Sequence, residues 1–550
     1  MKAEKYIRER ISDALGALTY TDPARIEINL ERPKQEDHGD FSCNVAMLLA
    51  GAAKKAPRSI AEEIVSHLEL DDRYIEKVDI AGPGFINFYL GWDYYRDIVR
   101  EVLDSGDAYG RSDWGEGTGL QVEFISANPT GPLNIVSARA AAVGDVLVNL
   151  FNAVGYNAKS EYYINDAGRQ VRLLGQSVSS HYMKLLGIDE PFPEEGYHGE
   201  YVRDLAKDIR DEKGDLFVNM PEGERYAALS QLALERMIKS HQSIIEEYRI
   251  HFDRWFRESE LREEDAQNKI LDIYERKGLS YEKDGAIWFK STEFGDEKDR
   301  VLVTREGEPT YFLIDIAYHK NKYDRGFDIL YNLLGPDHHG YIPRMKASLV
   351  ALGYPADSFR AAIIQQVNLL RAGEVIKMSK RAGKIIEMRE LIDEVGVDAA
   401  RFFFTNRKIS SHLDFDIDLA KEQSDENPVY YLQYAHARIC AILRFAAENK
   451  IDIDKEADLS YLVEKEEKDL IKGLSQFPEY VSMAARSVEP HFLPNYLQSL
   501  AALFHRFYHL HKVVSEDVER SQARLALVRS TQTVLQNGFK ILGISAPEKM

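Results

Sequence analysis

One stretch of the sequence decides the fold: Val122-Glu123-Phe124-Ile125-Ser126-Ala127-Asn128-Pro129-Thr130-Gly131-Pro132-Leu133-Asn134-Ile135-Val136-Ser137-Ala138-Arg139. It begins as a buried strand, passes through a turn rich in proline and glycine, and opens into a helix near Asn134. The first turn of such a helix offers unpaired amide groups and the positive end of the helix dipole, which suit a phosphate. We therefore expect a nucleotide to bind here, although an ordinary crossover without a ligand has the same spacing.

The sequence around this stretch predicts a Rossmann-type parallel sheet. Short apolar runs alternate with helical patterns between about residues 120 and 400, as in βαβ units. We expect strands at 120–125, 158–163, 329–334 and 361–367, and a helix at 138–152. A charged helical stretch at about 190–280 is predicted to be an insertion into this sheet domain.

The chain is predicted to be a multidomain α/β protein with three parts. Residues 1–110 form a small α/β domain with a helix at 4–17, a helix from about Asn44 and a strand pair near 78–90; a glycine-rich linker starts at Gly106. Residues 111–420 form the Rossmann-type catalytic domain. Residues 421–550 form an all-α bundle, because strand patterns disappear there and apolar residues recur at three- and four-residue intervals.

Net charge, cysteine content and hydropathy exclude several classes of protein. The 550 residues carry a net charge of −20, so any nucleic-acid site must be local. The two cysteines, Cys43 and Cys440, are far apart, which argues against a zinc–thiolate cluster or a disulfide framework. The N-terminus has no apolar leader, and no window approaches an uninterrupted membrane span. We expect a cytoplasmic enzyme with no membrane partner.

A second informative segment is Val375-Ile376-Lys377-Met378-Ser379-Lys380-Arg381-Ala382-Gly383-Lys384. It holds four cations between Lys377 and Lys384, with Ser and Gly among them. Flexible ammonium groups on a loop can follow the charge that develops as pyrophosphate leaves a nucleotide. Taken alone, a basic segment of this kind is more often a solvated loop.

Together these segments resemble the class I aminoacyl-tRNA synthetases, which combine a HIGH tetrapeptide at a helix start with a KMSK loop. Lys377-Met378-Ser379-Lys380 matches the second signature in full. The resemblance is specifically to arginyl-tRNA synthetases, and it covers nearly the whole chain. Its motifs are Glu36–Phe41, Ser126–Pro132, Tyr162–Gln170, Gln423–Arg438 and Leu542–Met550.

One position departs from the family. The HIGH tetrapeptide reads Asn134-Ile135-Val136-Ser137, so both histidines and the glycine are replaced. Val136 puts a branched side chain where adenine would approach the backbone, while Asn134 and Ser137 can donate only neutral hydrogen bonds. Two alternatives therefore stay open. One is a catalytically impaired RNA-binding paralogue, and the other is an enzyme that adenylates arginine for a different acceptor.

The resemblance assigns residues to three roles. A guanidinium is a permanently charged donor fork that needs carboxylate acceptors, which Glu123 and Asp315 could supply. By resemblance, the arginine-binding residues are Glu123, Asn128, Ser137, Tyr311, Asp315 and His338. The ATP-binding residues are Pro132, Asn134, Val136, Ser137, Met378, Ser379 and Lys380, and the catalytic residues are Asn134, Ser137, Lys377 and Lys380. ATP and Mg²⁺ are the implied cofactors. His338-His339 lacks a third ligand at metal spacing, so no protein-bound structural metal is expected.

The C-terminal region is the predicted RNA-binding surface. Residues 491–550 carry seven basic and four acidic side chains, a net charge of +3 in an acidic chain. His505, Tyr508, His509 and His511 could stack on unpaired bases, or they could simply border the helix core. The resemblance implies arginine tRNA, L-arginine and ATP as partners, an N-terminal domain at the outer corner of the tRNA, adenylate formation only with tRNA bound, and a monomer.

Overall fold

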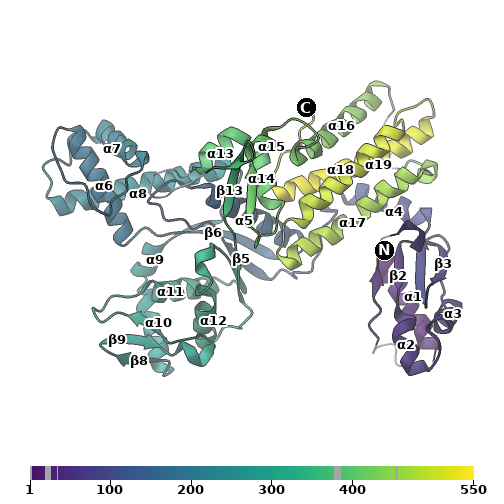
Figure 1. The fold of residues 1–550 in the computed structure, drawn as a ribbon, viewed down its shortest axis with the longest axis horizontal. Helices are drawn as coiled ribbons and strands as arrows, with labels where there is room; N and C mark the ends of the chain where they lie inside the picture. Colours follow the sequence, from purple (N-terminus) through teal and green to yellow (C-terminus); the bar gives the residue numbers. More distant parts are fainter. Residues whose placement is uncertain (1–2, 19–25, 34, 377–385, 452–455) are drawn as a thin grey trace.

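The computed structural model describes residues 3–18, 26–33, 35–376, 386–451 and 456–550. A five-stranded parallel sheet lies in its central part (Figure 1). Its strand order is β12-β11-β5-β6-β7, and every neighbouring pair is parallel. The strands are β5 (Gly119–Glu123), β6 (Asn157–Ile164), β7 (Arg254–Arg257), β11 (Ile329–Leu334) and β12 (Phe359–Ile363). The predicted Rossmann-type parallel sheet is confirmed.

The crossover from β5 to β6 is helix α5 (Ile135–Ala153), which begins where the sequence predicted a helix start. Its length and composition alone would allow it to cross a membrane, but 67% of the apolar window is buried inside the fold. Arg139 on this helix is fully buried and donates to the carbonyls of Gln365 at 2.8 Å and Lys408 at 2.9 Å. The helix is therefore anchored in the core of the central-sheet region.

Two excursions leave the sheet, and both overlap the insertion expected at about 190–280. Between β6 and β7, helices α6 (Arg169–Leu185), α7 (Glu200–Lys213) and α8 (Glu222–Glu247) share an apolar core of their own. Between β7 and β11 come α9 (Glu258–Glu263), α10 (Ala266–Arg276), the antiparallel strands β8 (Ser280–Lys283), β9 (Ala286–Phe289) and β10 (Arg300–Val303), and α11 (Tyr311–Asp324). Strand β7 lies inside the range expected to be an insertion, but it belongs to the central sheet. Its sequence did not predict a strand because it is short and charged.

The chain after β11 differs from expectation at one strand. The segment 361–367, expected to be a single strand, is divided between two strands: β12 ends at Ile363, and β13 (Val367–Arg371) begins at Val367. Strand β13 pairs with β14 (Glu374–Val375) and β15 (Leu413–Asp416) in a separate sheet. Helices α12 (Tyr341–Leu352), α13 (Met388–Val395), α14 (Val397–Thr405) and α15 (Ile417–Lys421) complete this part.

The N-terminal region forms a four-stranded antiparallel sheet of order β1-β2-β4-β3 with helices packed on it. Its elements are α1 (Ala3–Ala17), β1 (Leu30–Glu31), β2 (Phe41–Cys43), α2 (Val45–Ala53), α3 (Pro57–Ser66), β3 (Ile75–Ala81) and β4 (Phe85–Leu90). The expected strand pair is therefore the β3–β4 hairpin.

The C-terminal region is helical, as predicted, and contains α16 (Pro428–Glu448), α17 (Lys465–Ser487), α18 (Phe492–Leu510) and α19 (Val518–Leu542). The N-terminal region lies beside this bundle in Figure 1, linked to it by α4 (Trp92–Ser105). Arg96 on α4 donates to the carbonyl of Leu459 at 3.0 Å, and Lys472 on α17 pairs with Asp40 at 2.7 Å.

Candidate functional site

The chain bends sharply after β5, where the sequence changes from strand to turn. Ile125 and Ser126 have φ angles of +67° and +41°, in the left-handed region that non-glycine residues rarely adopt. Such a conformation costs about 1–3 kcal/mol per residue and persists where the surrounding structure fixes it. Here the Ser126 hydroxyl holds the turn in this conformation, since it donates to Glu123 Oε1 at 2.8 Å and accepts from the Tyr163 amide at 3.2 Å.

The turn after β5 is held by side chains from the helical excursion. The Tyr201 hydroxyl on α7 donates to the carbonyl of Thr130 at 2.7 Å, and His241 Nε2 on α8 lies 2.8 Å from the carbonyl of Gly131. Burial lowers the pKa of His241, so the imidazole is neutral and donates from Nε2. Its Nδ1 lies 3.1 Å from the Tyr162 hydroxyl. Helices α7 and α8 therefore fix the shape of this turn.

The start of α5 corrects one expectation from the sequence. Asn134 is the N-cap, and its Oδ1 accepts from the amides of Val136 at 2.9 Å and Ser137 at 3.2 Å. Two amides expected to be free for a phosphate are thus already paired, because asparagine is among the strongest N-caps. Among the residues that the structure describes, the Asn134 amide group and the Ser137 hydroxyl donate to no other side chain or carbonyl. Pro132 and Val136 are half-buried beside them.

The predicted basic loop, with Lys377, Met378, Ser379 and Lys380, lies outside the described residues. Its far flank is described and returns to the start of α5. Glu387 forms an isolated antiparallel bridge with Asn134, and the Met388 amide donates to the carbonyl of Leu133 at 2.8 Å. The described flank that follows the second signature is therefore joined to the first signature by backbone pairing.

Buried ion pairs lie where β5, β6 and α11 meet. Lys322 Nζ is 2.6 Å from Glu123 Oε2, and the Asn332 amide donates to the same oxygen at 3.2 Å. Nearby, Arg325 binds Glu161 through two hydrogen bonds of 2.6 and 2.8 Å. Sequence reasoning did not single out Lys322. A stripe at positions 311, 315, 319 and 322 of one helix face was the signal that could have found it.

Asp315 is a carboxyl group without a counter-charge of its own. Burial, together with the nearby carboxylates of Glu123 and Glu258, raises the pKa of Asp315 to about 7. Its side chain accepts no hydrogen bond and forms no ion pair within the described parts of the chain; only its backbone carbonyl is engaged, by His319 Nδ1 at 2.8 Å. A cationic ligand beside Asp315 would relieve this repulsion and stabilise the ionised form.

The other predicted arginine-binding residues lie around this cluster to different degrees. Tyr311 is the first residue of α11, one turn before Asp315 and therefore on the same face, and it is 66% exposed. His338 is exposed, with its ring edge-on to Tyr341 at 6.0 Å between centres. Burial and the carboxylates of Asp315 and Glu123 raise the pKa of Tyr341, the residue that His338 contacts. Asn128 is exposed on the turn.

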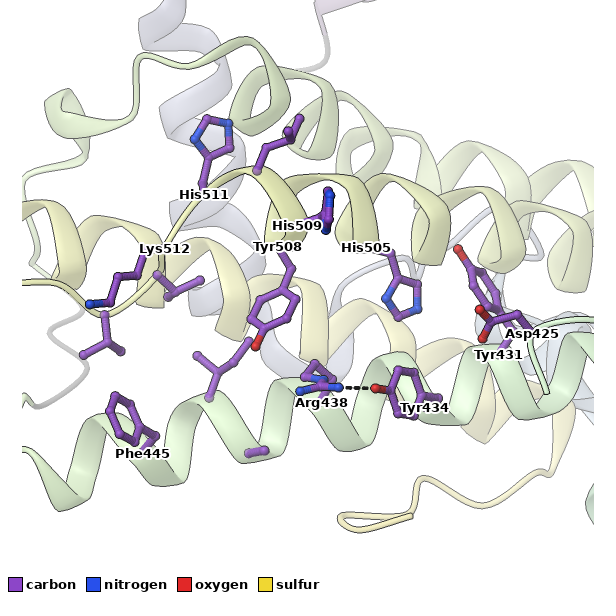
Figure 2. Close-up of a pocket in the computed structure, with 15 residues that line it drawn as sticks. Asp425, Tyr431, Tyr434, Arg438, Phe445, His505, Tyr508, His509, His511 and Lys512 are labelled. Carbon is purple, nitrogen blue, oxygen red and sulfur yellow. Dashed lines mark hydrogen bonds between the residues drawn. The ribbon is translucent and has the colours of Figure 1, made fainter. Parts of the chain in front are cut away.

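A second candidate site is a groove of about 1130 Å³ on the helical bundle, between α16 and the end of α18 (Figure 2). All four predicted stacking residues line it: His505, Tyr508, His509 and His511. The Arg438 guanidinium lies over two rings of the groove, 5.1 Å from the centre of Tyr434 and 5.4 Å from that of Tyr508. His511 Nε2 is 3.0 Å from a carboxylate oxygen of Glu466, so this imidazole already has a partner. In the described parts of the chain, no group of three or more His, Cys, Asp or Glu is placed to hold a metal ion.

Comparison with known proteins gives the same order of regions along the chain. Residues 5–90 match the arginyl-tRNA synthetase N-terminal domain, residues 99–415 match the class I (R) tRNA synthetase catalytic domain, and residues 432–550 match the DALR anticodon-binding domain.

Relatives match over their full length. The chain is 48% identical to arginine–tRNA ligase 1 of Halalkalibacterium halodurans, covering 100% of this chain and 99% of that protein. It is also 48% identical to the arginine–tRNA ligase of Bacillus subtilis, covering 99% and 98%. The Thermus thermophilus arginyl-tRNA synthetase structure shares the fold, with a TM-score of 0.75 at 22% identity, over 99% of this chain and 100% of that one. The chain therefore belongs to the arginyl-tRNA synthetase family of class I aminoacyl-tRNA synthetases.

Proposed function

We propose that this chain attaches L-arginine to arginine tRNA through an arginyl-adenylate formed from ATP. The observation that carries the proposal is Asp315, a half-buried carboxyl group whose side chain has no hydrogen-bond or ion-pair partner in the described structure. Its pKa is raised by burial and by the carboxylate of Glu123, at the carboxyl end of β5. Ligands of open parallel sheets bind at this edge. A guanidinium supplies the single positive charge and the planar donors that this position lacks.

The nucleotide would bind at the start of α5. Asn134 caps the helix with its Oδ1, which leaves its amide group and the Ser137 hydroxyl as donors toward the phosphates. Lys377 and Lys380 would stabilise the charge that develops as pyrophosphate leaves, while Pro132, Val136, Met378 and Ser379 would border ATP. Mg²⁺ would accompany the ATP phosphates, to which it supplies charge neutralisation.

The bridge between Asn134 and Glu387 supports a working site rather than a retired one. It ties the altered tetrapeptide to the flank of the complete Lys377–Lys380 signature. Asn134 also has a definite structural task in place of the family histidine. No observation favours the impaired paralogue, and the relatives that match over the full chain are named arginine–tRNA ligases.

For the tRNA, we propose that the bundle groove receives unpaired anticodon-side bases. Stacking on His505 and Tyr508, with Arg438 beside them, would supply sequence-tolerant contacts. The region 1–110 would contact the outer corner of the tRNA. We further propose that the enzyme works as a cytoplasmic monomer and forms the adenylate only when tRNA is bound, as the family resemblance implies.

A charging assay tests the central proposal. Folded protein is incubated with ATP, Mg²⁺, bulk tRNA and labelled L-arginine, with citrulline as a neutral analogue of the same shape. Arginyl-tRNA is the expected product, and citrulline should give none because it lacks the charge that Asp315 would balance. Absence of arginine-dependent product from folded protein would overturn the proposal.

A further inference from the structure

Lys322 is a fully buried lysine whose ammonium group is directed into the arginine site. Its side chain is 0% exposed, and Nζ lies 2.6 Å from Glu123 Oε2 and 4.3 Å from the centre of the Tyr318 ring. A buried ammonium is costly unless a carboxylate pairs with it. Here the partner is a residue predicted to bind the substrate, so the cost is tied to the site.

The protein itself engages both carboxylate oxygens of Glu123. Its Oε1 accepts from the Ser126 hydroxyl, and its Oε2 accepts from Lys322 and from the Asn332 amide at 3.2 Å. The Asn332 amide is in turn 3.0 Å from His319 Nε2, which ties β11 to α11. The carboxylate of Glu123 is thus fixed in orientation and paired with a cation before any substrate binds.

The other carboxylates of the cluster also have cations. Glu161 is paired with Arg325, and Glu258 is paired with Arg262 at 2.8 Å. Each pair carries no net charge, although the Glu258 carboxylate still raises the pKa of Asp315. Asp315 remains as the carboxyl group of this described cluster without such a partner.

We propose that Lys322 is a positioning residue that sets the net charge of the arginine site. By neutralising and orienting Glu123, it leaves a single carboxylate, Asp315, to be balanced by one guanidinium. The inference rests on the proposed function and deepens it, because it explains how a site with several carboxylates takes one monovalent cation.

Removing Lys322 should therefore change how the site titrates. Asp315 faces Glu123 on β5, Glu258 on α9, Arg344 on α12 and Lys322 on its own helix, with the hydroxyls of Tyr163 and Tyr341 nearby. The ammonium of Lys322 lowers the pKa of Asp315. Without it, two unbalanced carboxylates repel and the pKa of Asp315 rises above its value of about 7. The ionised form that binds a guanidinium then needs a higher pH.

The first test compares Lys322→Met and Lys322→Arg in the full chain. Lys322→Met should raise the KM for arginine about tenfold or more while kcat changes less than about threefold. The acid limb of kcat/KM for arginine should move to higher pH, whereas the KM for ATP should not change. Lys322→Arg keeps the charge and should recover most of the loss. An arginine KM within about twofold of the wild type in folded Lys322→Met would overturn the inference.

A double-mutant cycle separates this role from a purely structural one. If Lys322 works through Glu123, adding Lys322→Met to Glu123→Gln should change the arginine KM little, since the charge it balances is gone. Additive effects on the arginine KM would overturn the inference. If Lys322→Met alone fails to fold, the double variant, which removes both members of the ion pair, can be compared with Glu123→Gln instead.

A matched control is the buried pair of Arg225 with Glu190, 2.6 Å apart in the helical excursion, with side chains 9% and 8% exposed. Arg225→Met should lower the melting temperature but leave the arginine KM unchanged. The two proposals fail separately. A wild-type chain without arginine-dependent charging would overturn the proposed function, while an active wild type with an additive cycle would overturn only the role of Lys322.

Discussion

At the proposed arginine site, most charged side chains form ion pairs in the interior, whereas the groove on the helical bundle is lined by aromatic rings. Lys322 is fully buried against Glu123, and Asp315 keeps a raised pKa beside them. In the groove, Arg438 lies over the rings of Tyr434 and Tyr508, while His509 is exposed. The first region offers fixed charges, and the second offers ring faces.

This difference follows the chemistry of the two proposed substrates. A free amino acid is small, so discrimination must come from a few groups whose charge and orientation are set in advance. An RNA loop presents many bases, each with a face that can stack, so an open groove of rings can bind it with modest energy per contact. Variants of the first region should therefore alter the arginine KM, and variants of the second should alter the tRNA KM.

The largest effect is expected at Asp315. Asp315→Asn removes the carboxylate that would balance the guanidinium, a loss of about 3–5 kcal/mol that corresponds to a rise in the arginine KM of about 150- to 4000-fold. Steady-state charging kinetics at varied arginine would measure it. The tRNA KM serves as the internal control and should stay unchanged. An unaltered arginine KM would place the amino-acid pocket elsewhere.

A second prediction separates binding from chemistry. Lys380→Ala should lower the charging rate by about 10²-fold or more with little change in the arginine KM, since a loop cation engages the phosphates late in the reaction. Single-turnover assays with saturating arginine would detect it. A loss that appeared mainly in the arginine KM would contradict this role.

The groove should respond differently. Tyr508→Ala removes a ring that stacks on Phe504 and carries Arg438 at its face, and it should raise the tRNA KM about tenfold, within the 1–3 kcal/mol range of one base–aromatic contact. The arginine KM should not move. Tyr480→Ala is a suitable control, because Tyr480 lies on α17, stacks with Tyr496 and does not line the groove. Equal effects from both variants would indicate a folding defect rather than a binding surface.

The sequence predicted more of the fold than of the site. Periodicity and turn residues located β5, α5 and β11 to within a few residues, because long buried elements carry strong patterns. They missed the sheet strand β7, whose sequence Arg254-Trp255-Phe256-Arg257 is short and flanked by charge. They also merged β12 with β13, because a single apolar run does not reveal that the chain changes sheets.

At the site, the residue types were predictable but their partners were not. Glu123 and Asp315 were chosen because a guanidinium needs carboxylates, and the structure brings them together with a raised pKa on Asp315. Lys322 is 199 positions from Glu123, so only the folded structure shows that its ammonium group pairs with that carboxylate. The cap at Asn134 was also missed, because the resemblance directed attention to its donors rather than to its oxygen.

The smallest predicted effect concerns this altered tetrapeptide, and it is the most informative about whether the site is used. The Ser137 hydroxyl has no acceptor in the described structure, and Ser137 is half-buried at the start of α5. If it donates a neutral hydrogen bond to ATP or arginine, Ser137→Ala should slow charging about three- to tenfold, as expected for about 0.5–1.5 kcal/mol. Ser137→Thr keeps the hydroxyl and should retain most of the rate, whereas tRNA binding should be normal in both variants. A chain that binds tRNA, and whose turnover is the same with serine or alanine at this position, would show that the hydroxyl takes no part. The side-chain amide of Asn134 would then be the remaining donor to the phosphates at the helix start, while its Oδ1 continues to cap the helix.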